Sequence, residues 1–267
     1  MWHRPCPRLH VDAGDEVVFA WRSFEAYPIL MELAGARQVR VPLDDAEGHD
    51  LDAMTAAVTD RTKVILLCTP NNPTGVPISR DRLEAFLQSV RSHVLVVIDE
   101  AYVEYADAGS GPDSLALYRQ YPNVCILRTF SKAYGLAGLR VGYAVAVPAI
   151  AEGLRRTALP FSVSALAQKA AIASLDAGEE MAARASAVRE ERARMAAELE
   201  AQGWKLQPSQ GNFLWIRADE VLLATLVEAF NGAGIMVRAY QGDGVRITVA
   251  DAASNDCVLR LLAAHAA

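Results

Sequence analysis

The sequence predicts an α/β fold: a doubly wound, mostly parallel sheet in a large domain, followed by a small C-terminal α/β domain. Uninterrupted apolar runs such as residues 63–68 and 94–98 are typical of strands that helices cover on both faces. These runs alternate with amphipathic segments, which is the pattern of parallel strands joined by crossover helices. After Pro160 the chain becomes rich in alanine and charge, which indicates a change of architecture.

The first 160 residues contain the elements of the predicted large sheet. Ser23 is the predicted N-cap of the first helix, which Gly35 ends, and Ser79 is the N-cap of the third. The predicted strands cover residues 16–19, 39–42, 63–68, 94–98, 124–129 and 141–147. The predicted helices cover residues 24–33, 51–58 and 82–90.

The rest of the chain predicts long helices and then smaller elements. Helices are expected over 164–175 and 179–201, and Gly203 ends the second. Beyond it, strands are expected at 213–217, 235–238 and 245–249, with helices at 222–230 and 255–264. We therefore expect a large domain over 1–160, linking helices over 161–202 and a small domain over 203–267.

Composition restricts the function classes. The chain has 267 residues and a net charge of −6, which argues against nucleic acid as a partner. No apolar run is long enough to span a membrane, and residues 1–8 contain no secretory core segment. The scattered cysteines suggest neither disulfides nor a metal site; Cys68 and Cys125 are expected to be buried free thiols, and the other two are Cys6 and Cys257. A cytoplasmic location is the simplest expectation.

Polar residues follow three of the predicted strands. Asn72 follows one, Asp99 and Tyr102 the next, and Ser131 and Lys132 the third. The carboxyl ends of parallel strands meet at one edge of a sheet, where ligands bind. Each residue alone has a simpler explanation: Asn72 as a turn residue, Asp99 as a helix cap, Tyr102 as packing. Together they predict a site.

Lys132 decides what kind of site this would be. A single lysine after a strand is usually a solvated surface charge. The alternative is an amine that forms a Schiff base with a carbonyl cofactor. Lys63 is the nearest rival, but it begins its strand and should lie at the opposite edge of the sheet.

Several motifs, in order, resemble the fold type I pyridoxal-phosphate aminotransferases. Within them the chain resembles the histidinol-phosphate aminotransferase family, and two segments are closest to its actinobacterial aromatic amino acid (phenylalanine) branch. The family motifs are residues 71–75 (NNPTG), 99–102 (DEAY), 131–140 (SKAYGLAGLR) and 211–214 (GNFL). The segments similar to the aromatic branch are residues 21–28 (WRSFEAYP) and 242–248 (GDGVRIT).

The resemblance implies pyridoxal 5′-phosphate as cofactor and a role for each matching residue. Lys132 would form the Schiff base and shuttle a proton, and Asp99 would pair with the pyridinium nitrogen. The remaining cofactor contacts would be Tyr102 and Asn72 at the ring oxygen, Ser131 and Arg140 at the phosphate, and Phe24 on the ring face. Substrate contacts would be Arg246 at the α-carboxylate, Arg238 at a second group, and Asn212 and Tyr27.

The implied reaction moves an amino group from an aromatic amino acid to 2-oxoglutarate. Histidinol phosphate is the alternative donor, and a catalytically weak or silent family member is a further alternative. A decarboxylase or lyase is disfavoured, because Arg246 suits an α-carboxylate that is retained. The family is homodimeric, so small-molecule substrates and a second copy are the expected partners.

The start of the chain departs from the family pattern. The family's first strand, its phosphate-cradling turn and its N-terminal arm have no counterpart before Asp12, so the sequence is expected to be N-terminally truncated. The strand at 141–147 would then be an exposed antiparallel edge. Weak cofactor binding, doubtful dimerisation and low solubility are the expected consequences.

Overall fold

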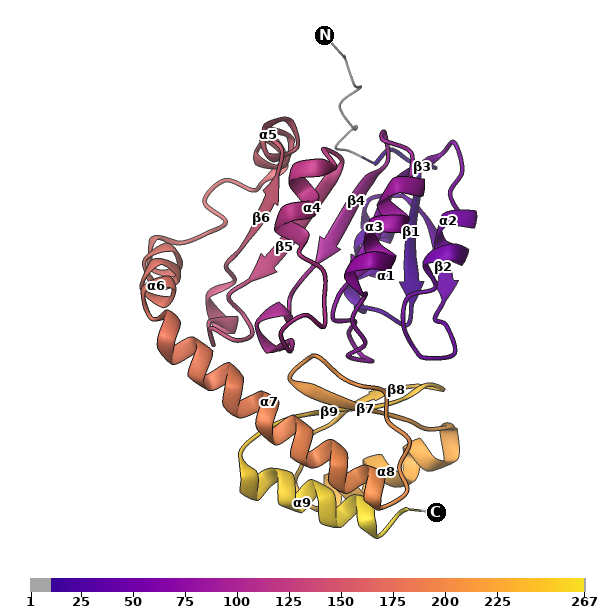
Figure 1. The fold of residues 1–267 in the computed structure, drawn as a ribbon, viewed down its shortest axis with the longest axis vertical. Coiled ribbons are helices and arrows are strands. Elements are labelled where there is room, and N and C mark those ends of the chain that lie inside the picture. The colour runs from indigo at the N-terminus through magenta and orange to yellow at the C-terminus, as the bar shows by residue number, and fades with distance from the viewer. Residues whose placement is uncertain (1–10, 267) are drawn as a thin grey trace.

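The computed structural model describes residues 11–266. Predictions that fall on residues 1–10, including Cys6 and the start of the large domain, lie outside the described residues. Within 11–266 the chain forms two sheets, one above the other in Figure 1, which the helix α7 (Gly178–Ala201) joins. No helix of this part of the chain is long and apolar enough to cross a membrane.

The large sheet has six strands in the order β2-β1-β3-β4-β5-β6. All neighbours are parallel except β5 and β6, so the predicted mostly parallel sheet is confirmed. β6 lies at one edge, antiparallel and partly exposed, as the resemblance implied. The strands are β1 (Glu16–Trp21), β2 (Arg37–Pro42), β3 (Thr62–Cys68), β4 (Leu95–Asp99), β5 (Val124–Thr129) and β6 (Gly142–Ala146).

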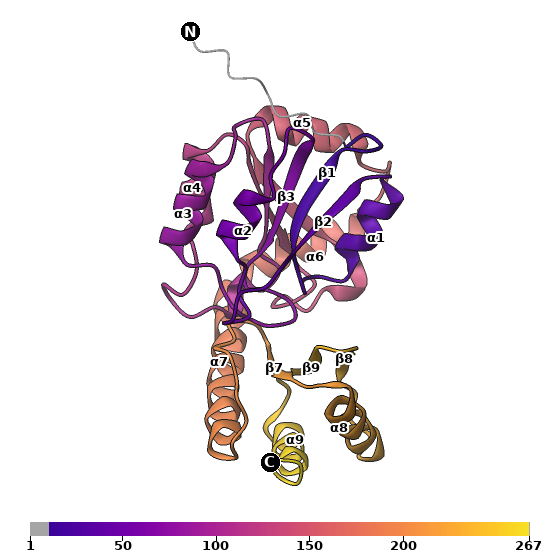
Figure 2. The ribbon, with the colours of Figure 1, turned by 90° about the vertical axis from the view of Figure 1, so that its right-hand side faces the viewer.

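Helices cover both faces of this sheet (Figure 2). The helices α2 (Leu51–Ala56), α3 (Arg80–Ser89) and α4 (Ser114–Gln120) lie on one face, and α1 (Ala26–Leu33) and α5 (Pro148–Thr157) on the other. Alternate strand residues serve the two faces: Val18 packs toward α2 and α3, while Phe19 packs on α1. This double coverage explains the uninterrupted apolar runs.

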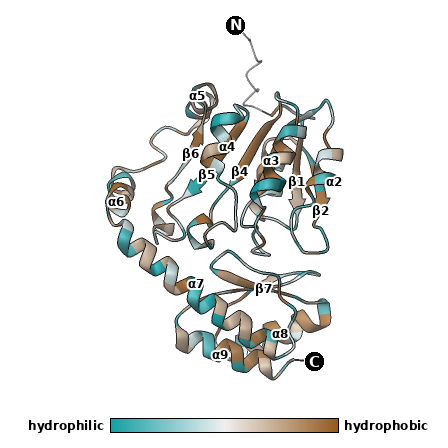
Figure 3. Ribbon diagram, viewed as in Figure 1, coloured by the Kyte–Doolittle hydropathy of each residue, from teal (hydrophilic) through white to brown (hydrophobic). Residues whose placement is uncertain are grey.

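The small sheet has the antiparallel order β7-β9-β8, with β7 (Phe213–Arg217), β8 (Arg238–Tyr240) and β9 (Gly244–Thr248). Three helices cover one face of this sheet: α8 (Glu220–Gly232), α9 (Ala252–Ala263) and the end of α7. Leu214 and Ile216 of β7 pack against them. The helix α6 (Ala165–Asp176) precedes α7 and packs against Phe130. Hydropathy follows this arrangement, with apolar residues gathered along β7 and the buried strands (Figure 3).

Several predictions about single elements need correction. Ser23 does not cap α1, because its hydroxyl donates to Asn71 Oδ1 (2.8 Å) and the helix begins after Glu25. The strand expected at 235–238 begins at Arg238 instead, since Ile235 and Val237 pack on the small core before the pairing with β9 starts. Neither α4 nor α5 was predicted from the sequence.

Candidate active site

The ends of β3, β4 and β5 meet at one edge of the large sheet. Cys68 of β3 pairs with Asp99 of β4, and Asp99 pairs with Leu127 of β5. The backbone continues this pairing past the strand ends, since Thr69 N donates to Asp99 O (3.0 Å) and Glu100 N donates to Leu127 O (2.9 Å). The predicted convergence of the three polar strand ends is therefore confirmed.

Asp99 is a half-buried carboxylate whose hydrogen-bond partners are neutral. The Tyr27 hydroxyl donates to Asp99 Oδ2 (2.9 Å) and Ala101 N donates to Asp99 Oδ1 (3.2 Å). Burial raises the pKa of Asp99, although these hydrogen bonds and the charge of Lys132 oppose the shift. Among residues 11–266 no salt bridge reaches this carboxylate. Its surroundings fit a ligand that brings a cationic N–H.

Lys132 lies beside Tyr102 in the same site. Its ammonium nitrogen is 4.9 Å from the centroid of the Tyr102 ring. Burial lowers the pKa of Lys132, and the neighbouring charges of Arg246 and Arg140 lower it further. Burial also raises the pKa of Tyr102 to about 12, so its hydroxyl is a proton donor at neutral pH. A larger fraction of such a lysine is the neutral amine, which is the form that acts as a nucleophile or accepts a proton.

The small sheet contributes a guanidinium. Arg246 on β9 donates to Asn72 Oδ1 in a short hydrogen bond, and Tyr240 OH also donates to this oxygen (3.4 Å). The Arg246 guanidinium carbon is 5.0 Å from the centroid of the Phe213 ring. Within the described chain its Nε is buried with no hydrogen-bond partner. An anion placed here would satisfy that N–H.

Ser131 and Arg140 form a second polar pair after β5. Arg140 has a left-handed backbone (φ 53°), and its Nη1 donates to Ala137 O (2.9 Å) and Ser131 Oγ (3.5 Å). Arg140 is exposed and Ser131 is half-buried. A hydroxyl beside a guanidinium is a suitable donor set for a phosphate.

The remaining predicted residues lie around this centre. Phe24 is 41% exposed and meets Tyr27 edge to face, with ring centroids 5.6 Å apart. Tyr27 is only 5% exposed, and its hydroxyl donates to Asp99, so it is not accessible to a substrate. Asn212 is half-buried, and its backbone O accepts from Val249 N (2.9 Å). Arg238 contacts Glu25 instead of the centre.

Sequence reasoning missed a buried network around Asn71. Its Oδ1 contacts Ser23 Oγ (2.8 Å) and His49 Nε2 (3.3 Å), and its Nδ2 donates to Arg22 O (3.1 Å). Burial lowers the pKa of His49 to about 4, so the ring is neutral at physiological pH. The network fixes the loop that presents Asn72. The only signal in the sequence was the Asn71–Asn72 pair, which also reads as an ordinary turn.

Gly75 ends the same loop and cannot be replaced. Its φ is +80°, and a Cβ at this position would lie 2.1 Å from Ser209 Oγ. Its carbonyl accepts from Gln210 N (2.8 Å), which joins the loop after β3 to the segment before β7. Both the backbone conformation and the close approach therefore require glycine.

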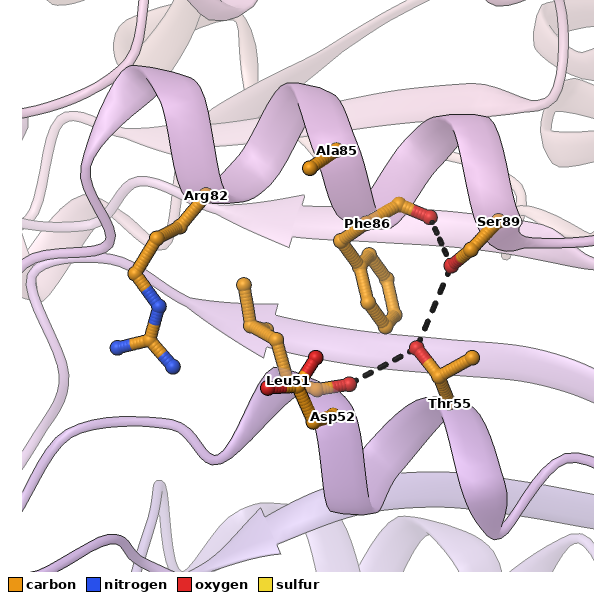
Figure 4. A pocket seen from close by; sticks show the side chains of 7 residues that line it. All are labelled: Leu51, Asp52, Thr55, Arg82, Ala85, Phe86 and Ser89. Atoms are coloured by element: carbon orange, nitrogen blue, oxygen red, sulfur yellow. Dashed lines mark hydrogen bonds between the residues drawn. The ribbon is translucent and has the colours of Figure 1, made fainter.

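A shallow groove of about 250 Å³ lies between α2 and α3, on the outer face of the large sheet (Figure 4). Its hydroxyls are engaged internally: Thr55 donates to Leu51 O (2.8 Å) and Ser89 to Phe86 O (2.7 Å). Arg82 at its end already contacts Asp44 (3.4 Å). The groove lies away from the strand ends, so we assign it no role in the site.

The fold and the converging side chains define a class of protein. Residues 5–263 match the family model for aminotransferase class I and II, and the chain belongs to this family. Its mostly parallel sheet with an appended small α/β unit is that of the fold type I aminotransferases, as the resemblance implied. The converging strand ends lie within the matched residues.

Two named relatives show which members of the family the chain is similar to. It is 55% identical over 248 residues to the aromatic amino acid aminotransferase of Streptomyces coelicolor, covering 93% of this chain and 69% of the relative. It is 53% identical over 253 residues to the enzyme of the same name from Mycobacterium tuberculosis, covering 95% and 71%. The chain thus spans about 70% of the length of these relatives.

A solved structure gives a second comparison. The histidinol-phosphate aminotransferase of Sinorhizobium meliloti, in complex with pyridoxal-5′-phosphate, superposes with a TM-score of 0.88 at 31% identity. The alignment covers 96% of this chain and 72% of that protein.

Proposed function

We propose that this chain transfers the amino group of an aromatic amino acid to a 2-oxo acid, 2-oxoglutarate being the expected acceptor, with pyridoxal 5′-phosphate as cofactor. The observation that carries the proposal is the meeting of Asp99, Lys132 and Arg246 at the strand ends. The relatives named aromatic amino acid aminotransferase, at 53–55% identity, support the choice of substrate.

The residues present fit the cofactor. Asp99 would hold a protonated ring nitrogen, a cation that its hydrogen-bond partners do not supply. Tyr102 and Asn72 would bind the ring oxygen, and Ser131 and Arg140 the phosphate. Phe24 would cover one ring face, while Tyr27 positions Asp99 from below. When bound, the cofactor supplies the electron withdrawal that makes the substrate Cα–H acidic.

The protein's own groups would then bind and deprotonate the substrate. Arg246 would bind the α-carboxylate, with Asn212 beside it, and so orient the Cα–H bond toward Lys132. Lys132 would hold the cofactor covalently and, once released, accept the Cα proton at Nζ. Its lowered pKa favours the neutral amine that this step needs. Phe213 and Tyr102, which meet edge to face, form an apolar wall beside the site.

Histidinol phosphate is the second candidate donor. The observation that favours it is the superposition on the Sinorhizobium meliloti enzyme. The sequence identity to that enzyme is 31%, against 55% for the Streptomyces coelicolor relative, so we place aromatic amino acids first. Arg238 would bind the second anionic group of such a donor.

We also propose the assembly and organisation that the sequence predicted. The large domain would end near 160, the helices over 161–202 would link it to a small domain over 203–267, and the location would be cytoplasmic. The family is homodimeric, but we expect this chain to dimerise poorly. Met195 and Leu199, in the last turns of α7, pack in the core of the small domain. The linking helices would therefore be attached to the small domain at this end.

Specificity constants test the function. The purified chain, supplied with pyridoxal phosphate and 2-oxoglutarate, is expected to prefer phenylalanine over histidinol phosphate. A large preference for histidinol phosphate would reverse the choice of substrate. The absence of visible absorbance on adding the cofactor, together with no turnover of either donor, would favour the catalytically silent alternative.

A further inference from the structure

Arg238 is held by a carboxylate from the other side of the site. Both its Nε (3.1 Å) and its Nη2 (2.8 Å) donate to Glu25 Oε2. Glu25 immediately precedes α1 and follows Phe24, while Arg238 begins β8. The ion pair therefore joins the large sheet to the small sheet at the rim of the site.

Arg238 lies on the same face of the small sheet as Arg246. It is directly opposite Arg246 in the β8–β9 ladder, and directly opposite residues of an antiparallel pair share one face. Tyr240, two residues further along β8, shares this face, and its hydroxyl reaches Asn72 (3.4 Å). A free Arg238 would thus add a second guanidinium beside the one that suits an α-carboxylate.

We propose that Glu25 is a specificity-determining residue that occupies Arg238 and so excludes substrates with a phosphate at the end opposite the reacting amine. This inference rests on the proposed function, because it concerns the donor chosen by the same site. A phosphate near Arg238 would have to displace Glu25 and would carry nearly two negative charges beside that carboxylate. A neutral aromatic side chain meets neither obstacle. Discrimination by repulsion of the wrong ligand is a general way to achieve specificity.

The pair is accessible to solvent, which limits the size of the effect. The side chains of Arg238 and Glu25 are 59% and 37% exposed. Water and salt screen such a pair, so its contribution to stability is small and its removal should leave the fold intact. We expect Glu25 to weaken the binding of a phosphorylated ligand about tenfold relative to the same ligand without its phosphate. The effect should be smaller for 2-oxoglutarate, whose distal carboxylate carries a single charge.

The test compares histidinol phosphate with histidinol, which differ only in the phosphate. Their dissociation constants are measured by calorimetry on the chain loaded with pyridoxamine phosphate, the cofactor form that does not react with amines, as wild type, Glu25→Gln, Glu25→Ala, Arg238→Gln and the double variant Glu25→Gln/Arg238→Gln. The preference for the phosphorylated ligand should rise about tenfold in both Glu25 variants and return to the wild-type value in the double variant. Glu32→Gln, which removes the same charge elsewhere on α1, is the matched control and should change nothing.

An unchanged preference in the Glu25 variants would overturn the inference. So would an equal rise in the double variant, because the phosphate would then not be binding to Arg238. Binding is measured without turnover, so this result is separate from the proposed function. Wild-type turnover of phenylalanine tests that function on its own.

Discussion

The two edges of the large sheet surround a carboxylate in opposite ways. At the amino edge, Glu16 begins β1 and is 2% exposed. It accepts from Arg37 (3.0 Å) and Arg61 (2.8 Å), and from Thr59 in a short hydrogen bond. At the carboxyl edge, Asp99 ends β4, and among residues 11–266 it accepts hydrogen bonds only from a tyrosine hydroxyl and a backbone amide.

The pKa directions express the difference. The hydrogen bond from Thr59 is the main cause that lowers the pKa of Glu16, and the two arginines assist. Burial raises the pKa of Asp99. A carboxylate that is hydrogen-bonded to two arginines has its charge compensated within the fold, whereas one without a salt bridge can accept a cationic ligand. The contrast supports the carboxyl edge as the place of the proposed site.

The largest expected effect comes from removing the amine at the carboxyl edge. Lys132→Ala should lower transamination by at least about a thousandfold, because it removes both the covalent attachment and the proton acceptor. Borohydride reduction of the cofactor-treated protein, followed by peptide mapping, should place the label on Lys132 and find none in the variant.

Lys63 is the matched control at the amino edge. It lies at the start of β3, with its ammonium nitrogen 3.8 Å from Asp15 Oδ1. Lys63→Ala should keep the label on Lys132. A label on Lys63, Lys169 or Lys205 in the wild type would contradict the assignment.

Asp99→Asn should slow turnover by about a hundred- to a thousandfold, because an amide cannot keep the ring nitrogen protonated. Stability should respond differently. A carboxyl group whose pKa is raised in the fold contributes stability below its ordinary pKa, and this is lost as the pH rises through the raised value. At neutral pH the neutral variant should therefore be at least as stable as the wild type.

Steady-state kinetics and urea unfolding at pH 7 together check this prediction. Unchanged turnover per bound cofactor would reject the role of Asp99. A clear loss of stability at neutral pH would show that its charge is compensated after all, and the contrast between the two edges would fail.

Arg246→Lys should raise the KM for phenylalanine by about tenfold with a smaller change in kcat, because an ammonium cannot replace a guanidinium fork on a carboxylate. The KM for phenylalanine and the inhibition constant of phenylpropionate, which carries the carboxylate without the amine, should rise together. Arg217→Lys is a suitable control, because Arg217 ends β7 and contacts Glu47 (3.1 Å) rather than the centre. An equal effect of both variants would mean that Arg246 acts through the fold.

The smallest effect is expected at the amino edge. Glu16→Gln should lower the free energy of unfolding by about 1–2 kcal/mol, a modest loss because Arg37 and Arg61 are more than half exposed. A lowered pKa means that the contribution of Glu16 is present above its ordinary value of 4.5 and is lost as the pH falls through the lower folded value. The difference in unfolding free energy between wild type and variant should therefore disappear in acid, while turnover per folded molecule is unchanged.

The sequence by itself predicted the class of fold and the residues that converge at one edge of the large sheet. Apolar runs that end in Asn72, Asp99 and Lys132 are a local signal, and the geometry of any parallel sheet brings such strand ends to one edge. The thiols of Cys68 and Cys125 were expected to be buried for the same reason, and they are.

Tertiary structure alone decided how distant segments complete the site. Ser23 was expected to cap a helix, but its hydroxyl donates a hydrogen bond to the buried Asn71 side-chain oxygen, 48 positions away in the sequence. Glu25 and Arg238 are 213 positions apart, and neither shows in the sequence that it neutralises the other. Such contacts depend on how the small sheet sits against the large one, and that packing is set by long-range burial, which leaves no period in the local sequence.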